Sequence, residues 1–163
     1  MKSVDSEKAF QDCYSDDVSH CYGCGRLNEA GLQLKSYWDG EETVAVFTPR
    51  SEHTAIPGYV YGGLIASLID CHGTGTAAAV SARKEGFNPT GGESFPRFVT
   101  ASLQVNYLKP TPIGVPLEIR AVVEEAKPRK VVSAITVLVN GILCAKGRVV
   151  AVKMPDDFTL PNR

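Results

Sequence analysis

Apolar and polar residues alternate along much of the chain, a pattern typical of strands that are buried on one face. The clearest example runs over residues 98–108, where Val99 and Leu103 belong to one face and Thr100 and Gln104 to the other. Six strands are predicted on this basis, at residues 32–38, 43–48, 98–108, 117–126, 131–139 and 142–153. The last four are expected to follow one another in meander order.

Two glycine dipeptides mark hairpin turns between these strands. Asp39-Gly40 separates the first two, and Asn140-Gly141 separates the last two. Outside the strands, residues 6–18 could form a short helix, and residues 84–96 have no periodicity and are expected to form an exposed, mobile loop.

One long segment departs from the alternation. Residues 57–83 read PGYVYGGLIASLIDCHGTGTAAAVSAR, a glycine-rich turn followed by about twenty small and apolar residues. As a helix this segment would be roughly 30 Å long. Its larger side chains share one face and are expected to pack into the core: Leu64, Ile65, Leu68, His72 and Ala79.

The opposite face of this helix carries a single acid, Asp70, among small residues: Gly63, Ala66, Ser67, Gly73, Thr74 and Ala77. An ionised carboxylate is costly to bury without a partner. We therefore expect Asp70 to face a strip with room for another chain or a ligand. Each glycine in a helix interior costs up to ~1 kcal/mol, so the glycines also indicate close approach by another group.

These elements predict an α+β fold, an antiparallel sheet around one mostly apolar helix. The 163 residues suffice for one core. The predicted organisation is an N-terminal extension over residues 1–30, the main domain over residues 31–154 and a tail over residues 155–163.

Composition and charge then narrow the function classes. A net charge of −1 at pH 7 gives no support for nucleic acid or an anionic membrane surface as a partner. No apolar run reaches the length of a membrane span, and the first ten residues lack the apolar centre of a signal peptide. We expect a cytoplasmic protein.

The cysteines raise the question of a metal. There are five: Cys13, Cys21, Cys24, Cys71 and Cys144. Their odd number argues against a disulfide framework. Cys21 and Cys24 have CxxC spacing, and His20 and Cys13 could add further metal ligands. A structural zinc site usually draws on two paired ligand sets, and only one is present, so a glycine turn with packed thiols is the simpler interpretation. No cofactor is predicted.

Four segments, in this order and spacing, resemble the hotdog-fold thioesterases, specifically the phenylacetate-pathway-like branch that includes the mammalian THEM-type acyl-CoA thioesterases. The segments are CYGCGRLNEAGL, VYGGLIASLID, VTASLQVNYLKPTPIG and NGILCAKGRVVAVKM. The resemblance covers residues 21–153. It implies an antiparallel sheet wrapped around one central helix, assembly into a homodimer or a dimer of dimers, and hydrolysis of an acyl-CoA to a free acid and coenzyme A.

The resemblance also implies a catalytic set. The family motif reads His-Gly-Gly, with an acid eight residues after the first glycine, and these positions fall on Gly62 and Asp70. The Gly62 N–H would polarise the thioester carbonyl, as the unpaired amides of a helix N-terminus can. Asp70 of the other subunit would attack the carbonyl or activate water, and Thr100 would orient the attacking group. Tyr61 stands where the family has histidine.

Several residues are candidate substrate contacts. Tyr61, Gly63, Ser67 and His53 surround the glycine turn in sequence. Basic residues suit the phosphates of coenzyme A, and the candidates are Lys109, Arg129 and Lys130. His72 is not expected to pair with Asp70, since two residues along a helix turn the side chain by about 200°.

Other functions stay open at this point. A hotdog module without turnover could bind acyl-CoA or an acyl-carrier protein, a reading favoured by Tyr61. A zinc-stabilised interaction domain could use His20, Cys21 and Cys24. A hotdog dehydratase is a weaker alternative, because no histidine stands where such enzymes place one, and the absence of a GxSxG motif disfavours a serine hydrolase.

Overall fold

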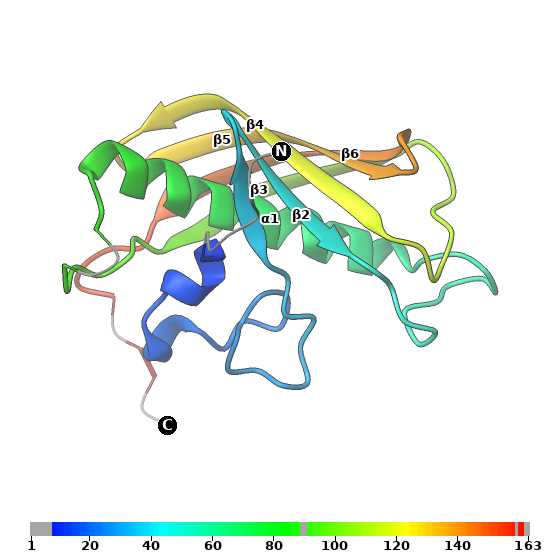
Figure 1. The fold of residues 1–163 in the computed structure, drawn as a ribbon, viewed down its shortest axis with the longest axis horizontal. Coiled ribbons are helices and arrows are strands. Elements are labelled where there is room, and N and C mark those ends of the chain that lie inside the picture. Colours follow the sequence, from blue (N-terminus) through cyan, green and yellow to red (C-terminus); the bar gives the residue numbers. More distant parts are fainter. Residues whose placement is uncertain (1–7, 89–90, 159, 162–163) are drawn as a thin grey trace.

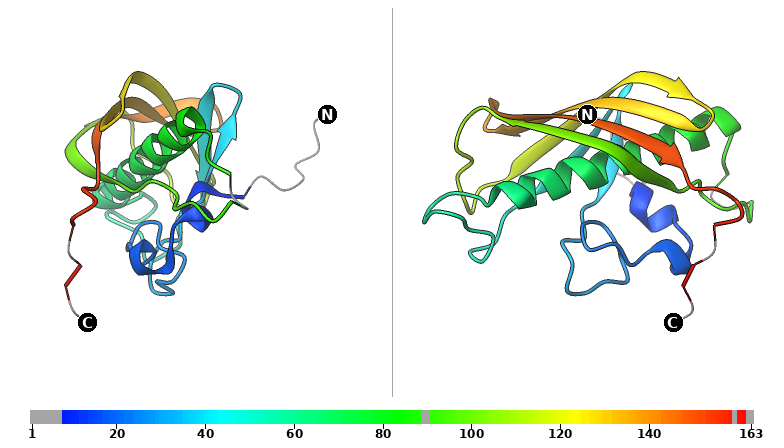
Figure 2. Two further views of the ribbon diagram at one scale, coloured as in Figure 1. Left: turned by 90° about the vertical axis from the view of Figure 1, so that its left-hand side faces the viewer. Right: turned by 180° about the vertical axis from the view of Figure 1, so that it is seen from behind.

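The computed structural model describes residues 8–88, 91–158 and 160–161, and one antiparallel six-stranded sheet curves around one long helix (Figure 1). Viewed from the side, the helix lies inside the curve of the sheet (Figure 2, left). This is the predicted hotdog architecture, which is confirmed. Within the described ranges, no helix combines the length and apolar character needed to cross a membrane.

The strands and the helix lie close to their predicted positions. They are β1 (Ser36–Asp39), β2 (Glu42–Phe47), α1 (Gly62–Glu85), β3 (Phe98–Tyr107), β4 (Leu117–Lys127), β5 (Lys130–Val139) and β6 (Ile142–Lys153). The helix begins at Gly62, after the predicted glycine-rich turn, and the amides that precede it bond outside the helix. Val60 N–H donates to the Thr111 carbonyl (2.8 Å) and Tyr61 N–H to the His53 carbonyl (2.9 Å).

The strand order corrects one prediction. The sheet runs β1-β2-β4-β5-β6-β3, so β4, β5 and β6 form a meander while β3 pairs with β6 at the far edge. The connection from β3 to β4 is the physical reason. Residues 108–116 are too long for a tight turn and carry three prolines. They pass the start of α1, where Ile113 N–H donates to the Gly58 carbonyl (3.0 Å).

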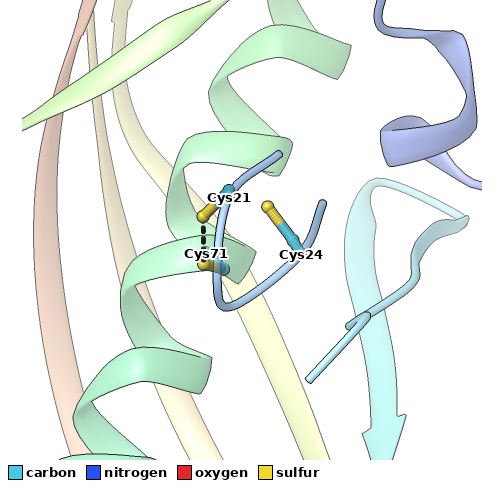
Figure 3. A group of neighbouring side chains, drawn as sticks. All are labelled: Cys21, Cys24 and Cys71. Atoms are coloured by element: carbon cyan, nitrogen blue, oxygen red, sulfur yellow. Dashed lines mark hydrogen bonds between the residues drawn. The ribbon is translucent and has the colours of Figure 1, made fainter. Parts of the chain in front are cut away.

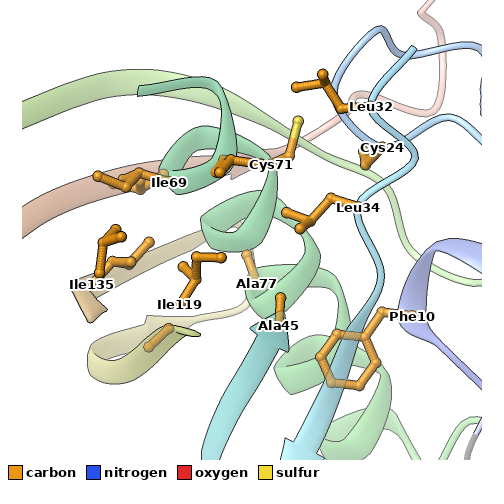
Figure 4. Packing of buried hydrophobic residues seen from close by; sticks show 14 of the residues in the cluster. Phe10, Cys24, Leu32, Leu34, Ala45, Ile69, Cys71, Ala77, Ile119 and Ile135 are labelled. Carbon is orange, nitrogen blue, oxygen red and sulfur yellow. The ribbon is translucent and has the colours of Figure 1, made fainter. Parts of the chain in front are cut away.

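The core lies between the concave face of the sheet and α1. Leu68 and Ile69 of the helix are fully buried, as are Ile119 of β4 and Ile135 of β5. Figure 4 shows Ile69 close to these two sheet residues. The predicted core face of the helix is confirmed, including His72, whose Nδ1 lies 2.9 Å from the Ser36 hydroxyl.

The strip of small residues on α1 is only partly open. Gly63, Ala66, Ser67 and Asp70 are half-buried, whereas Gly73, Thr74 and Ala77 are buried. A Cβ on Gly73 would lie 2.7 Å from Val149 of β6, and one on Gly75 would lie 2.8 Å from the Gln11 side chain. For these two glycines, the close approach expected from the sequence therefore comes from the same chain.

Residues 8–35 lie on the side of α1 away from the sheet (Figure 1). In place of the one helix predicted over residues 6–18, they form two 3-10 turns, η1 (Phe10–Cys13) and η2 (Asp16–Val18). Phe95 is buried with its ring 5.5 Å from Tyr14 and 5.2 Å from Phe87. The loop over residues 84–96, expected to be exposed, is thus anchored at this end by aromatic packing. Pro89 and Thr90 of the loop lie outside the described residues, and the boundaries at residues 30 and 154 stay predictions.

Candidate active site

Asp70 and Thr100 are in direct contact. The Thr100 hydroxyl, from the exposed edge strand β3, donates to the Asp70 carboxylate, in the third turn of α1. Partial burial raises the pKa of Asp70 above its ordinary value, while the Thr100 hydrogen bond stabilises the charged form and opposes that rise. The result is a half-buried carboxylate that is held in one orientation and faces the open part of the strip.

A β-bulge explains how Thr100 reaches the helix. Thr100 pairs with Ala151 and Ser102 with Val150, so Ala101 is an extra residue in β3. Before the bulge, Phe98 and Thr100 face α1; after it, Tyr107 does, since its hydroxyl donates to the Gly62 carbonyl (2.7 Å). The predicted uniform alternation along this strand is wrong, because the bulge exchanges its two faces.

The start of α1 opens on a groove. Tyr61 is the N-cap residue and makes no side-chain cap, and Gly62 is the first helical residue. Within the described part of the chain, the amides of Gly62 and Gly63 have no hydrogen-bond acceptor. The adjoining groove has a volume of about 310 Å³ and is lined by Tyr59, Val60, Gly62, Ile65, Tyr107, Leu108, Lys109, Pro110 and Thr111. Two unpaired donors and the positive end of the helix dipole therefore meet at an open, partly apolar site.

The other candidates near this turn differ in what they touch. The Tyr61 ring lies where a Cβ on Gly63 would be, so any larger residue at position 63 would displace it. Ser67 donates to the Gly63 carbonyl (2.9 Å), which occupies its hydroxyl within the helix. His53 accepts from Arg50 N–H (3.0 Å) through Nδ1, and its ring lies 5.7 Å from that of Phe47. Partial burial and the Arg50 charge lower the pKa of His53, which favours the neutral imidazole.

The basic candidates lie at opposite ends of the helix. Lys109 is exposed at the rim of the groove beside Gly62. Arg129 and Lys130 lie at the turn between β4 and β5, which approaches the end of α1: Lys84 donates to the Ala126 carbonyl (3.1 Å). Only Lys109 is therefore close to the helix N-terminus of its own chain.

Gly62 and Asp70 are also apart within one chain. Eight residues of α-helix span about 12 Å along the axis, which exceeds the reach of one thioester carbonyl and its attacking group. A single subunit carries both halves of the predicted constellation but does not bring them together.

Sequence reasoning missed two residues of this region. Tyr107, whose hydroxyl donates to the Gly62 carbonyl, lies within the strand predicted over residues 98–108 and was given no role in the site. Its position directly before the Leu108-Lys109-Pro110 turn was the available signal. Cys71 follows Asp70 and lies 3.7 Å (Sγ to Sγ) from Cys21 in the N-terminal loop. No signal in the sequence pairs two cysteines fifty residues apart.

Comparison with known proteins is consistent with this geometry. The model of the Thioesterase superfamily matches residues 57–145. A crystal structure of a Thioesterase superfamily protein from Shewanella loihica PV-4 is 52% identical, covering 86% of this chain and 98% of that one with a TM-score of 0.65. No curated protein sequence matches.

Two more distant structures share the fold. A thioesterase from Haemophilus influenzae is 16% identical, with 80% of this chain and 85% of that one covered and a TM-score of 0.63. The E. coli PaaI protein from the phenylacetic acid degradation operon is 17% identical, with coverage of 76% and 81% and a TM-score of 0.60.

Proposed function

Because this chain belongs to the thioesterase superfamily, we propose that it is a cytoplasmic acyl-CoA thioesterase, which hydrolyses the thioester bond to give a free acid and coenzyme A. The observation that carries the proposal is the Asp70–Thr100 contact on the open strip of α1. A carboxylate held by a single hydroxyl keeps lone pairs free for a substrate or a water molecule.

The groove at the start of α1 supplies the complementary chemistry. Attack on a thioester carbonyl places negative charge on its oxygen, and a preorganised N–H donor stabilises that charge. The Gly62 amide is the first of the helix and borders the groove. We assign it as the oxyanion donor, with Gly63 and Tyr61 as its neighbours and Lys109 as a contact for a coenzyme A phosphate.

Two subunits would complete one site. Gly62 and Asp70 are about 12 Å apart along one helix. Gly62 of one chain would therefore act with Asp70 of the partner chain. The edge strand β3 supports such a dimer. It is ten residues long, pairs with β6 alone among the described strands and exposes Val99, Leu103 and Tyr107. An exposed apolar edge is a template for pairing with another strand, and two β3 strands side by side would join both sheets.

Two routes of hydrolysis fit this site. In one, an Asp70 oxygen attacks the carbonyl carbon, the carbon–sulfur bond breaks, the coenzyme A thiolate takes up a proton, and water then hydrolyses the mixed anhydride. In the other, Asp70 accepts a proton from a water molecule that attacks directly. Single-turnover hydrolysis in oxygen-18 water distinguishes them, since only the anhydride route labels the Asp70 side chain.

The test of the function is thiol release from short, long and aromatic acyl-CoAs. Wild type should hydrolyse at least one of them, and Asp70→Asn, which keeps the size and removes the charge, should lose at least ~100-fold in kcat. Asp156→Asn, an exposed residue near the C-terminus, is the matched control and should retain full activity. Full activity of Asp70→Asn would remove Asp70 from the chemistry.

A second candidate function rests on Tyr61. Tyr61 takes the position at which the family motif has histidine. It is 58% exposed, and its ring lies beside Gly63. A protein that binds acyl-CoA tightly and releases no thiol from any member of the panel would be a binding module on an enzyme fold. Restoration of turnover by Tyr61→His would then identify the residue responsible.

A further inference from the structure

Three cysteine sulfurs converge outside the proposed catalytic groups. The Sγ atoms of Cys21, Cys24 and Cys71 all lie within 4.8 Å of one another, and those of Cys21 and Cys71 are 3.7 Å apart (Figure 3). All three are free thiols. Cys21 and Cys24 come from the N-terminal loop, and Cys71 points at them from α1 (Figure 3).

The spacing suits a tetrahedral metal ion. A Zn–S bond is about 2.3 Å, which places two sulfurs of one tetrahedral site roughly 3.8 Å apart. The Cys21–Cys71 sulfur separation of 3.7 Å already matches this value. No two of the three sulfurs are more than 4.8 Å apart, so metal binding would bring any pair closer by at most about 1 Å. We propose that Cys21, Cys24 and Cys71 bind one Zn²⁺ ion, which fastens the N-terminal loop to the central helix.

Donor groups and a cation surround the three sulfurs. The Cys21 sulfur lies among the thiols of Cys24 and Cys71 and the backbone N–H groups of Cys24 and Gly23. The Arg97 guanidinium lies near the cluster and places a positive charge beside its sulfurs. Donors around a ligand sulfur are the outer contacts that orient metal ligands and balance their charge.

The two glycines of the loop are needed for this approach. A Cβ on Gly23 would collide with the Cys71 sulfur, and one on Gly25 would collide with the backbone of Cys21. The turn is closed by Gly25 N–H, which donates to the Cys21 carbonyl (2.7 Å), and is held from outside by Leu34 N–H, which donates to the Gly23 carbonyl (3.0 Å). Two ligands are therefore fixed before a metal arrives.

This site differs from the one considered from the sequence alone. There, His20 and Cys13 were the candidates to complete the CxxC pair. Instead, the third ligand is Cys71, and neither His20 nor Cys13 belongs to the cluster of described residues. Three thiolates select a soft or borderline ion such as zinc over magnesium or calcium. Cys21 is half-buried, and a water molecule would take the fourth position.

The proposed metal has a structural role, and the inference does not depend on the thioesterase proposal. A bound ion would join the loop to α1 across fifty residues of chain. Ligands that bind the folded state alone raise its stability. Removing the metal should therefore lower the melting temperature of wild type. It should not change the melting temperature of a variant that lacks one of the cysteine ligands.

The test is metal content and cobalt spectroscopy on the full chain, purified with reductant and without chelator. Wild type and the control Cys13→Ser should contain about one zinc per chain. Cys71→Ser and Cys21→Ser should each lose at least nine-tenths of it. Cobalt substitution should give thiolate charge-transfer bands and the visible bands of a tetrahedral site in wild type and Cys13→Ser, but not in Cys21→Ser or Cys71→Ser. Cys21→Ser keeps the test valid if the buried Cys71→Ser fails to fold.

Two outcomes would overturn the inference. One is wild type that takes up neither zinc nor cobalt when reconstituted under reducing conditions. In that case mass spectrometry of the oxidised protein would show whether Cys21 and Cys71 form a disulfide. The other is unchanged metal content in both cysteine variants. A chelator that shifts the melting temperature of Cys21→Ser as much as that of wild type would contradict the structural role.

Discussion

Gly62→Pro tests the oxyanion donor, because proline has no backbone N–H and should change the fold little at this position. Gly62 is the first residue of α1, where proline is favoured because its missing N–H has no partner in the helix. Tyr61 before it has φ −61° and ψ 129°, the extended conformation that a residue preceding proline requires. The substitution therefore deletes the amide donor and leaves the helix start in place.

The expected loss follows from the role of that donor. Removal of one preorganised oxyanion donor costs about 10²–10³ in kcat, or roughly 2.7–4 kcal/mol of transition-state stabilisation. The change in KM should be small, because the hydrogen bond strengthens as charge develops on the oxygen. Gly62→Ala is the matched control. It keeps the N–H and adds a Cβ at 3.4 Å from the Tyr107 ring, so any steric effect appears in both variants.

Thiol release with the best acyl-CoA of the panel measures both variants, and thermal unfolding checks that both are folded. Mixed dimers then test the shared site. If Gly62 and Asp70 act across subunits, random pairing of Gly62→Pro with Asp70→Asn gives half heterodimers, each with one intact site, and about one quarter of wild-type activity returns. A folded Gly62→Pro enzyme with wild-type kcat would refute the donor assignment, and no recovery on mixing would refute the shared site.

Three further predictions follow from other contacts. Thr100→Val removes the hydroxyl that holds Asp70 and should lower kcat about 10-fold with little change in KM. Leu103→Lys places a charge on the β3 edge and should give a monomer by light scattering, whereas Val46→Lys, at an equally apolar exposed site on β2, should not. Burial lowers the pKa of His72 to about 4, below its unfolded value of 6.5, so its contribution to stability is complete above pH 6.5 and is lost as the pH falls toward 4. Between pH 7 and 5 urea unfolding should show a loss of about 2 kcal/mol from this residue, and a pH-independent free energy of unfolding would contradict it.

Local patterns in the sequence were sufficient to predict most of the fold. Alternation located the six strands, and the Asn140-Gly141 pair located the last hairpin, which the structure contains as β5 and β6. The helix and its core face followed from the size of the side chains, and so did the prediction of His72 as a core residue. These features are decided by residues that lie close together in the sequence, so one sequence is enough to predict them.

The bulge and the strand order could not be predicted in this way. A bulge at Ala101 adds one residue that looks like any other in an alternating run, yet it turns Thr100 toward α1. The position of β3 beside β6 depends on where residues 108–116 cross the start of the helix. Both features are decided by contacts between segments far apart in the chain. The same holds for the packing of Phe95 against Tyr14.

Three consecutive residues of α1 show where sequence reasoning stops. Successive helical side chains diverge by about 100°, so Asp70, Cys71 and His72 meet three different parts of the molecule. Asp70 meets β3, His72 meets the hydroxyls of β1 and β2, and Cys71 meets the N-terminal loop. Helical geometry alone separates the acid from the core histidine. It gives no partner for Cys71 between them, because that partner is fixed by how residues 8–35 fold back on the helix.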